Sequence, residues 1–212
     1  GFYGFPRTEH PKKVWIIGGG VAGLEAAAIA AEKGHQVTVT EKSGRLGGQM
    51  ASAANGPWGD NEFMRMVNYL KNYGDRGGVR FETNRDVTVD DIKNSEADQI
   101  VLATGAVPQS DLPGADAKNV LSCLDVLNGE VKPGRTVAII GSGGVAISTA
   151  LFLVDEGGHE VSIVGPAKKF GLDVNPSYIW RYMKKLKEAD VKQYTKHKIK
   201  EFTLAGVVAV DP

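Results

Sequence analysis

The sequence predicts an α/β protein that contains two Rossmann-like dinucleotide-binding units. Residues 14–42 follow the order strand, glycine-rich turn, Ala-rich helix and strand, and residues 137–165 repeat that order. In both copies the turn has GxGxxG-type spacing, with the glycines of the first copy at Gly18, Gly20 and Gly23. Two copies of a mononucleotide-binding unit imply two nucleotide sites.

The other elements follow in chain order. We expect a loop over residues 44–59, then a helix with Phe63, Met66, Val67 and Leu70 on its apolar face. Strands are predicted near residues 79 and 97, and the second is continuously apolar, which is typical of a parallel sheet covered on both faces. An amphipathic helix at 175–190 and short strands follow the second unit. The predicted domains are a linker at 1–12, a first nucleotide domain at 13–112 and a second at 113–212.

Composition excludes several classes of function. Lys and Arg total 25 and Asp and Glu total 25, so the formal charge of zero gives no reason to expect nucleic acid or a membrane surface as partner. No apolar run reaches the roughly 18 residues of a membrane helix. Cys123 is the single cysteine, which excludes an internal disulfide or a CxxC pair, fits a cytoplasmic compartment and is interpreted as a packed residue. No residues show metal-ligand spacing.

The first glycine turn has the context of a dinucleotide fingerprint. Gly18 allows the tight turn, Gly20 leaves room for a pyrophosphate, and Gly23 lets helix and strand approach. The pyrophosphate would lie on free amides at the helix start, and Glu41 would accept hydrogen bonds from the ribose hydroxyls. The alternative is a glycine-rich turn without a ligand.

The second turn keeps the phosphate approach but not the acid. Gly141, Gly143 and Ala146 match the fingerprint, whereas Gly165 stands where the first copy has its glutamate. Without that acid the site favours a 2′-phosphorylated ribose, which Lys168 or Lys169 would meet. If both lysines simply face water, the choice between NADPH and NADH stays open.

Two further motifs carry a family resemblance. The segments EKSGRLGGQM after the first unit and ATGAVP before the second resemble the flavoprotein disulfide-reductase-like superfamily. The likeness is to the FAD/NAD(P)-binding module of the dienoyl-CoA reductase and trimethylamine dehydrogenase family. It implies that 13–112 is an incomplete FAD-binding domain, that Gly47, Gly48, Gln49, Thr104 and Gly105 help to hold FAD, and that 113–212 binds the nicotinamide nucleotide.

The complete set of predicted cofactor-binding residues covers both units. In the first unit these are Gly18, Gly20, Val21, Ala22, Gly23, Glu41, Lys42, Gly47, Gly48, Gln49, Val87, Ala103, Thr104 and Gly105. In the second unit these are Gly141, Gly143, Gly144, Val145, Ala146, Lys168 and Lys169. No catalytic side chain is predicted, because the flavin supplies the chemistry.

The resemblance implies an electron-input module of a flavin oxidoreductase. Hydride would pass from NADPH or NADH to FAD, and electrons would leave for another redox centre, an acceptor domain or protein, or an enoyl- or amine-type substrate. FMN and a 4Fe-4S cluster are expected only with an N-terminal barrel, so the chain is interpreted as an internal piece of a larger enzyme that could form a homo-oligomer. The alternative is a structural module that holds ADP or AMP.

Overall fold

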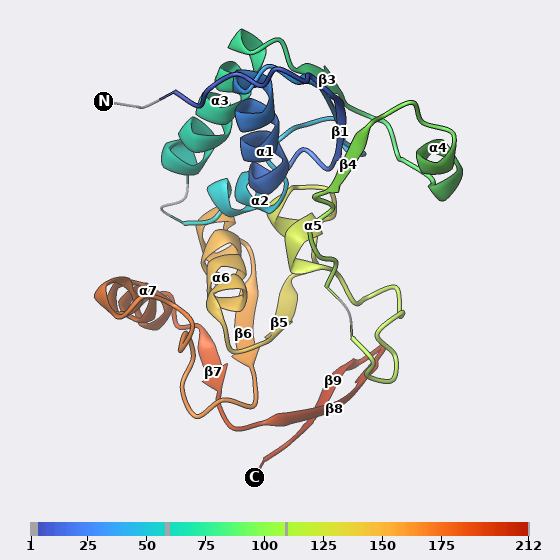
Figure 1. Cartoon of the computed structure of the whole chain (residues 1–212). Coiled ribbons are helices and arrows are strands. Elements are labelled where there is room, and N and C mark those ends of the chain that lie inside the picture. Colours follow the sequence, from blue (N-terminus) through green and yellow to red (C-terminus); the bar gives the residue numbers. More distant parts are fainter. Residues whose placement is uncertain (1–3, 58–59, 109, 212) are drawn as a thin grey trace. The chain divides into compact units, whose positions relative to one another are not determined.

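A computed structural model of the chain describes residues 4–57, 60–108 and 110–211. The chain divides into two compact units (Figure 1). The first comprises Gly1–Ala54 and Gly59–Val107, and the second comprises Asn55–Trp58 and Pro108–Pro212. Each unit is a parallel sheet with helices, as the two-copy sequence pattern predicts, so the fold class is confirmed.

The first unit contains a four-stranded parallel sheet in the order β3-β2-β1-β4. The strands are β1 (Lys13–Ile17), β2 (Gln36–Thr40), β3 (Arg80–Glu82) and β4 (Gln99–Leu102). Ile17 at the end of β1 pairs with Thr40 of β2 and Leu102 of β4. The carboxyl ends of these three neighbouring strands therefore meet on one side of the sheet, where open α/β sheets bind their ligands.

Two long helices belong to this unit. They are α1 (Val21–Glu32) and α3 (Asp60–Arg76), which lie against each other (Figure 1). Leu24 of α1 packs with Val67 and Leu70 of α3, and all three side chains are buried. Phe63 and Met66 were expected on the same apolar face, but both are exposed. Fewer residues of α3 are therefore buried than its apolar sequence pattern indicates.

Two local expectations were wrong. The segment expected as a loop contains the short helix α2 (Gln49–Ala54), three residues of which are buried. The apolar strand β4 lies at the edge of the sheet, and its residue Leu102 is 68% exposed, so the described part of the chain does not cover both faces of this strand.

A further helix of the first unit, α4 (Val89–Lys93), begins with a capping box between Thr88 and Asp91.

The second unit repeats the architecture with three parallel strands in the order β5-β6-β7. The strands are β5 (Thr136–Ile140), β6 (Glu160–Val164) and β7 (Lys192–Tyr194). The helices are α5 (Cys123–Leu127), α6 (Gly144–Glu156) and α7 (Pro176–Glu188), and an antiparallel hairpin follows with β8 (Lys198–Thr203) and β9 (Gly206–Val210). The core is centred on Ile147, Leu151, Ile163 and Leu186. Among the described residues no helix is both long and apolar enough to cross a membrane.

Candidate nucleotide-binding sites

The first glycine turn is sterically demanding at two positions. Gly18 has φ +113°, and a Cβ atom added to it would lie 2.2 Å from the Ala103 carbonyl oxygen. A Cβ on Gly23 would lie 2.0 Å from the Gly18 oxygen. Side chains at either position would collide with backbone, so these glycines allow α1 to begin directly against the ends of β1 and β4.

Gly20 is different, because the fold does not need it to be glycine. Its backbone is extended, with φ −72° and ψ 177°, and a Cβ added there would meet nothing within 4 Å. Gly20 is the N-cap of α1 and provides no side-chain hydrogen bond to the first amides of the helix. The turn therefore presents open space beside amides at a helix N-terminus, which suits a phosphate group.

The GGQ and ATGA segments both lie against this turn. Gly47 donates its N–H to the Gly19 oxygen at 2.8 Å, and a Cβ on Gly48 would lie 3.1 Å from the Gly20 Cα. The Gln49 Nε2 donates to the Ala106 oxygen at 3.1 Å, and Ala103 donates its N–H to Ile17 at 2.8 Å. Segments far apart in the sequence thus surround one exposed edge of the sheet.

Glu41 lies at the same edge and is only 8% exposed. Its Oε2 accepts from the Gly19 N–H at 2.7 Å, and its Oε1 accepts from the Ser43 N–H and hydroxyl, each at 2.9 Å. An ionised carboxylate offers about four acceptor positions, so one on Oε2 remains for a ribose hydroxyl. These three hydrogen bonds within the chain hold the carboxylate in place.

All but one of the remaining predicted residues of the first unit lie next to the turn or to a segment that contacts it. Val21 and Ala22 form the first turn of α1, and Lys42 is exposed directly after Glu41. Thr104 and Gly105 are exposed at the carboxyl end of β4. Val87 is half-buried in the loop after β3, and no described contact joins it to the glycine turn.

The second glycine turn has a similar backbone, but a carboxylate side chain lies at the start of its helix. Gly141 has φ +141° and donates its N–H to Val164 at 3.0 Å, just as Gly18 donates to Thr40 at 2.8 Å. At the start of α6 the Gly144 N–H lies 3.0 Å from both carboxylate oxygens of Asp173. An anion therefore occupies the place where the fingerprint predicts a phosphate. No sequence pattern indicated Asp173, which lies in the loop between β6 and α7.

The other predicted residues of the second unit surround this helix start. Val145 is exposed in the first turn of α6, whereas Ala146 is buried, with its Cβ 3.4 Å from a Cβ added to Gly141. Lys168 and Lys169 are exposed in the loop after β6, and neither forms an ion pair with a described residue. The Lys196 N–H donates to the Ala167 oxygen at 3.0 Å, which brings a third lysine to this loop.

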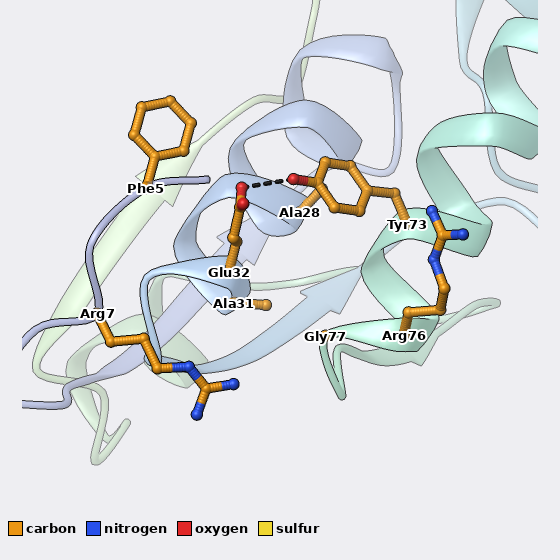
Figure 2. A pocket seen from close by; sticks show the side chains of 8 residues that line it. All are labelled: Phe5, Arg7, Ala28, Ala31, Glu32, Tyr73, Arg76 and Gly77. Atoms are coloured by element: carbon orange, nitrogen blue, oxygen red, sulfur yellow. Dashed lines mark hydrogen bonds between the residues drawn. The ribbon is translucent and has the colours of Figure 1, made fainter. Parts of the chain in front are cut away.

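A surface pocket in the first unit is unrelated to these turns. Figure 2 shows that Phe5 and Arg7 of the N-terminal segment line it, together with residues near the ends of α1 and α3. The Tyr73 hydroxyl donates to Glu32, and this hydrogen bond raises the pKa of Tyr73. Glu32 is the last residue of α1, so the pocket lies at the opposite end of that helix from Gly20.

Cys123 and the acids show no sign of a second reactive centre. The Cys123 side chain packs against the core of the second unit, and burial raises the pKa of its thiol. A side-chain hydrogen bond with Thr149 opposes that shift only in part. In the part of the chain that the structure describes, no three His, Cys, Asp or Glu residues are grouped to hold a metal.

A family model for pyridine nucleotide-disulphide oxidoreductases matches residues 12–211. The chain belongs to this family. Membership confirms the resemblance inferred from the motifs, because this family is an FAD/NAD(P)-binding module. The comparisons give no support to the alternative of a purely structural module.

Several relatives are longer proteins, and this chain matches only a part of each. Cinnamate reductase of Clostridium sporogenes is 40% identical over 163 residues, which cover 76% of this chain and 24% of that protein. NADH oxidase of Thermoanaerobacter brockii is 32% identical and is matched over 94% of this chain and 31% of its own length. A solved 2-naphthoyl-CoA reductase complex has a TM-score of 0.90 and 31% identity, and covers 97% of this chain and 31% of that one. The chain thus spans about a quarter to a third of these relatives.

Proposed function

We propose that this chain is the electron-input module of an FAD-dependent NAD(P)H oxidoreductase. The first unit holds FAD and the second holds an exchangeable nicotinamide dinucleotide. The observation that carries the proposal is the arrangement around Gly20, where a side chain would fit the fold but the sequence leaves open space beside a helix N-terminus. If the turn had only a structural role, nothing in the fold would require glycine at this position.

The residues present suit the proposed cofactor. The first amides of α1 would bind the FAD pyrophosphate, and Glu41 would accept a ribose hydroxyl through its remaining Oε2 position. Gln49 and the backbone around Gly105 border the same edge and would contact the flavin side. Bound FAD accepts the hydride that NAD(P)H supplies. The protein's own part is to bind and orient the two nucleotides, so no side chain acts as acid or base.

Onward electron transfer would involve parts of the enzyme beyond this module. The reductases of cinnamate and 2-naphthoyl-CoA among the relatives support an unsaturated acyl-type acceptor, and the resemblance supports FMN and a 4Fe-4S cluster on an accompanying barrel. We further propose residues 13–112 and 113–212 as the two nucleotide domains, and the cytoplasm, which a single cysteine fits, as the compartment.

The proposal is tested by the bound ligand and by Gly20→Ala. The ligand extracted from the purified holoenzyme should be FAD by mass spectrometry, whereas ADP or AMP would favour the structural module. Gly20→Ala should lower flavin retention and change the stability of the flavin-free protein by less than about 1 kcal/mol, because the added Cβ contacts nothing. Gly134→Ala, whose Cβ also meets nothing within 4 Å, is the matched control and should change neither property. Equal flavin retention in both variants would contradict the proposed site.

A further inference from the structure

The two units differ at a pair of positions beside the glycine turn. The backbone around the pair is equivalent, because Glu41 donates its N–H to Glu82 at 2.8 Å and Gly165 donates its N–H to Tyr194 at 3.0 Å. In the first unit the residue after the first glycine is Gly19, and in the second unit it is Ser142. The first pair is therefore Gly19 with Glu41, and the second is Ser142 with Gly165.

Each pair has room for only one side chain. A Cβ added to Gly19 would lie 3.0 Å from the Glu41 Cβ and 2.5 Å from a Leu46 methyl group. A Cβ added to Gly165 would lie 2.2 Å from the Ser142 Oγ and 2.9 Å from the Gly141 oxygen. The serine hydroxyl thus occupies the space where an acidic side chain at Gly165 would begin.

The serine also takes over a hydrogen bond of the missing acid. In the first unit the Ser43 N–H, two residues after the strand-end glutamate, donates to Glu41 at 2.9 Å. In the second unit the Ala167 N–H, two residues after Gly165, donates to the Ser142 Oγ at 3.3 Å. A hydroxyl that accepts this bond keeps its own hydrogen for donation, whereas a carboxylate has none.

We propose that Ser142, paired with Gly165, selects the 2′-phosphorylated nicotinamide dinucleotide by donating its hydroxyl hydrogen to the 2′-phosphate. The site replaces an anionic acceptor with a neutral donor, and the exposed Lys168, Lys169 and Lys196 border the same loop with positive charge. This inference rests on the proposed function of the second unit. It assigns the choice of coenzyme to two coupled residues rather than to Gly165 alone.

The direct test compares two adenosine probes on the holoenzyme by calorimetry. Adenosine 2′,5′-bisphosphate carries the selected phosphate and 5′-AMP lacks it. Ser142→Ala should weaken the bisphosphate roughly tenfold relative to 5′-AMP, since a hydrogen bond to a charged group is lost. Loss of the acceptor for the Ala167 N–H affects both probes alike and cancels in their ratio. Ser162→Ala, which removes a hydroxyl from β6, should leave the ratio unchanged.

The outcomes separate the inference from the proposed function. A wild-type enzyme that binds neither probe, NADPH nor NADH would overturn the proposed function of the second unit. A wild-type enzyme that binds NADPH, combined with a Ser142→Ala ratio equal to that of wild type, would overturn the inference alone.

A second set of variants tests the coupling without any nucleotide. Gly165→Glu alone should lower the melting temperature, and Ser142→Gly combined with Gly165→Glu should recover part of that loss, because the 2.2 Å contact with the hydroxyl is removed while the Gly141 oxygen remains close. The double variant should also prefer NADH over NADPH. Additive effects of the two substitutions on melting temperature would overturn the steric pairing.

Discussion

Asp173 competes with the coenzyme for the N-terminus of α6, so its neutralisation should strengthen coenzyme binding. The Gly144 N–H lies 3.0 Å from both carboxylate oxygens, and a Cβ on Gly143 would lie 2.6 Å from Oδ2. A pyrophosphate that approaches Gly143 and binds these amides must displace the carboxylate. Asp173→Asn keeps the size of the side chain and a capping oxygen but removes the charge that repels the ligand.

The magnitude follows from the exposed position of the contact. An anion at an exposed helix N-terminus contributes about 0.3–1 kcal/mol at low ionic strength. When about 0.3–1 kcal/mol no longer opposes binding, the Kd for NADPH should fall roughly two- to fivefold. Because the same contact caps α6, the variant without ligand should be slightly less stable than wild type. Binding and stability should therefore change in opposite directions.

The assay is calorimetric titration of the holoenzyme with NADPH at low and high salt, together with thermal unfolding. Asp116→Asn removes the charge of another exposed aspartate in the same unit and serves as the control, with no expected change in Kd. The gain from Asp173→Asn should shrink at high salt, because exposed charges are screened. An unchanged or weaker affinity in Asp173→Asn would refute the competition.

Three other substitutions or measurements test the remaining parts of both units. Glu41→Ala should lower the stability of the flavin-free protein by about 1–3 kcal/mol, since the buried Gly19 amide and the partly buried Ser43 amide lose their acceptor. Flavin should also be lost on dialysis, and unchanged unfolding and flavin content would contradict this role. Replacing Lys168 and Lys169 with Ala should raise the Kd for NADPH more than that for NADH, and a uniform change would place the phosphate elsewhere. Cys123 should be alkylated more slowly at neutral pH than an unstructured cysteine, with the rate rising at higher pH, because its raised pKa leaves less thiolate; equal rates would contradict its burial.

The features that follow from local sterics could be predicted from the sequence. Gly18 and Gly23 lie so close to backbone atoms that no other residue fits. Both positions must therefore be glycine, and the spacing of these glycines can be recognised in the sequence. Strands β1, β4 and β5 follow from short apolar runs. Glu41 was expected beside the turn, and the structure places its carboxylate on the Gly19 amide.

Contacts between distant segments could not be predicted in the same way. Asp173 reaches the start of α6 from a loop beyond β6, and an exposed aspartate in a loop has no distinguishing pattern. The short helix α2 lacks a periodic apolar stripe long enough to recognise. Alignment of the two repeats places Ser142 opposite Gly19, so the sequence already shows that the two units differ at this position. The role proposed for Ser142 also depends on its short distance to Gly165, which only the structure shows.

The most direct test of the electron-input function is anaerobic mixing of the FAD-loaded holoenzyme with NADPH and, separately, with NADH. We expect the visible absorption of the oxidised flavin to bleach with both coenzymes, and to bleach at lower concentrations of NADPH. Retention of the oxidised flavin spectrum with both coenzymes would contradict hydride transfer between the two units and leave this chain without its proposed function.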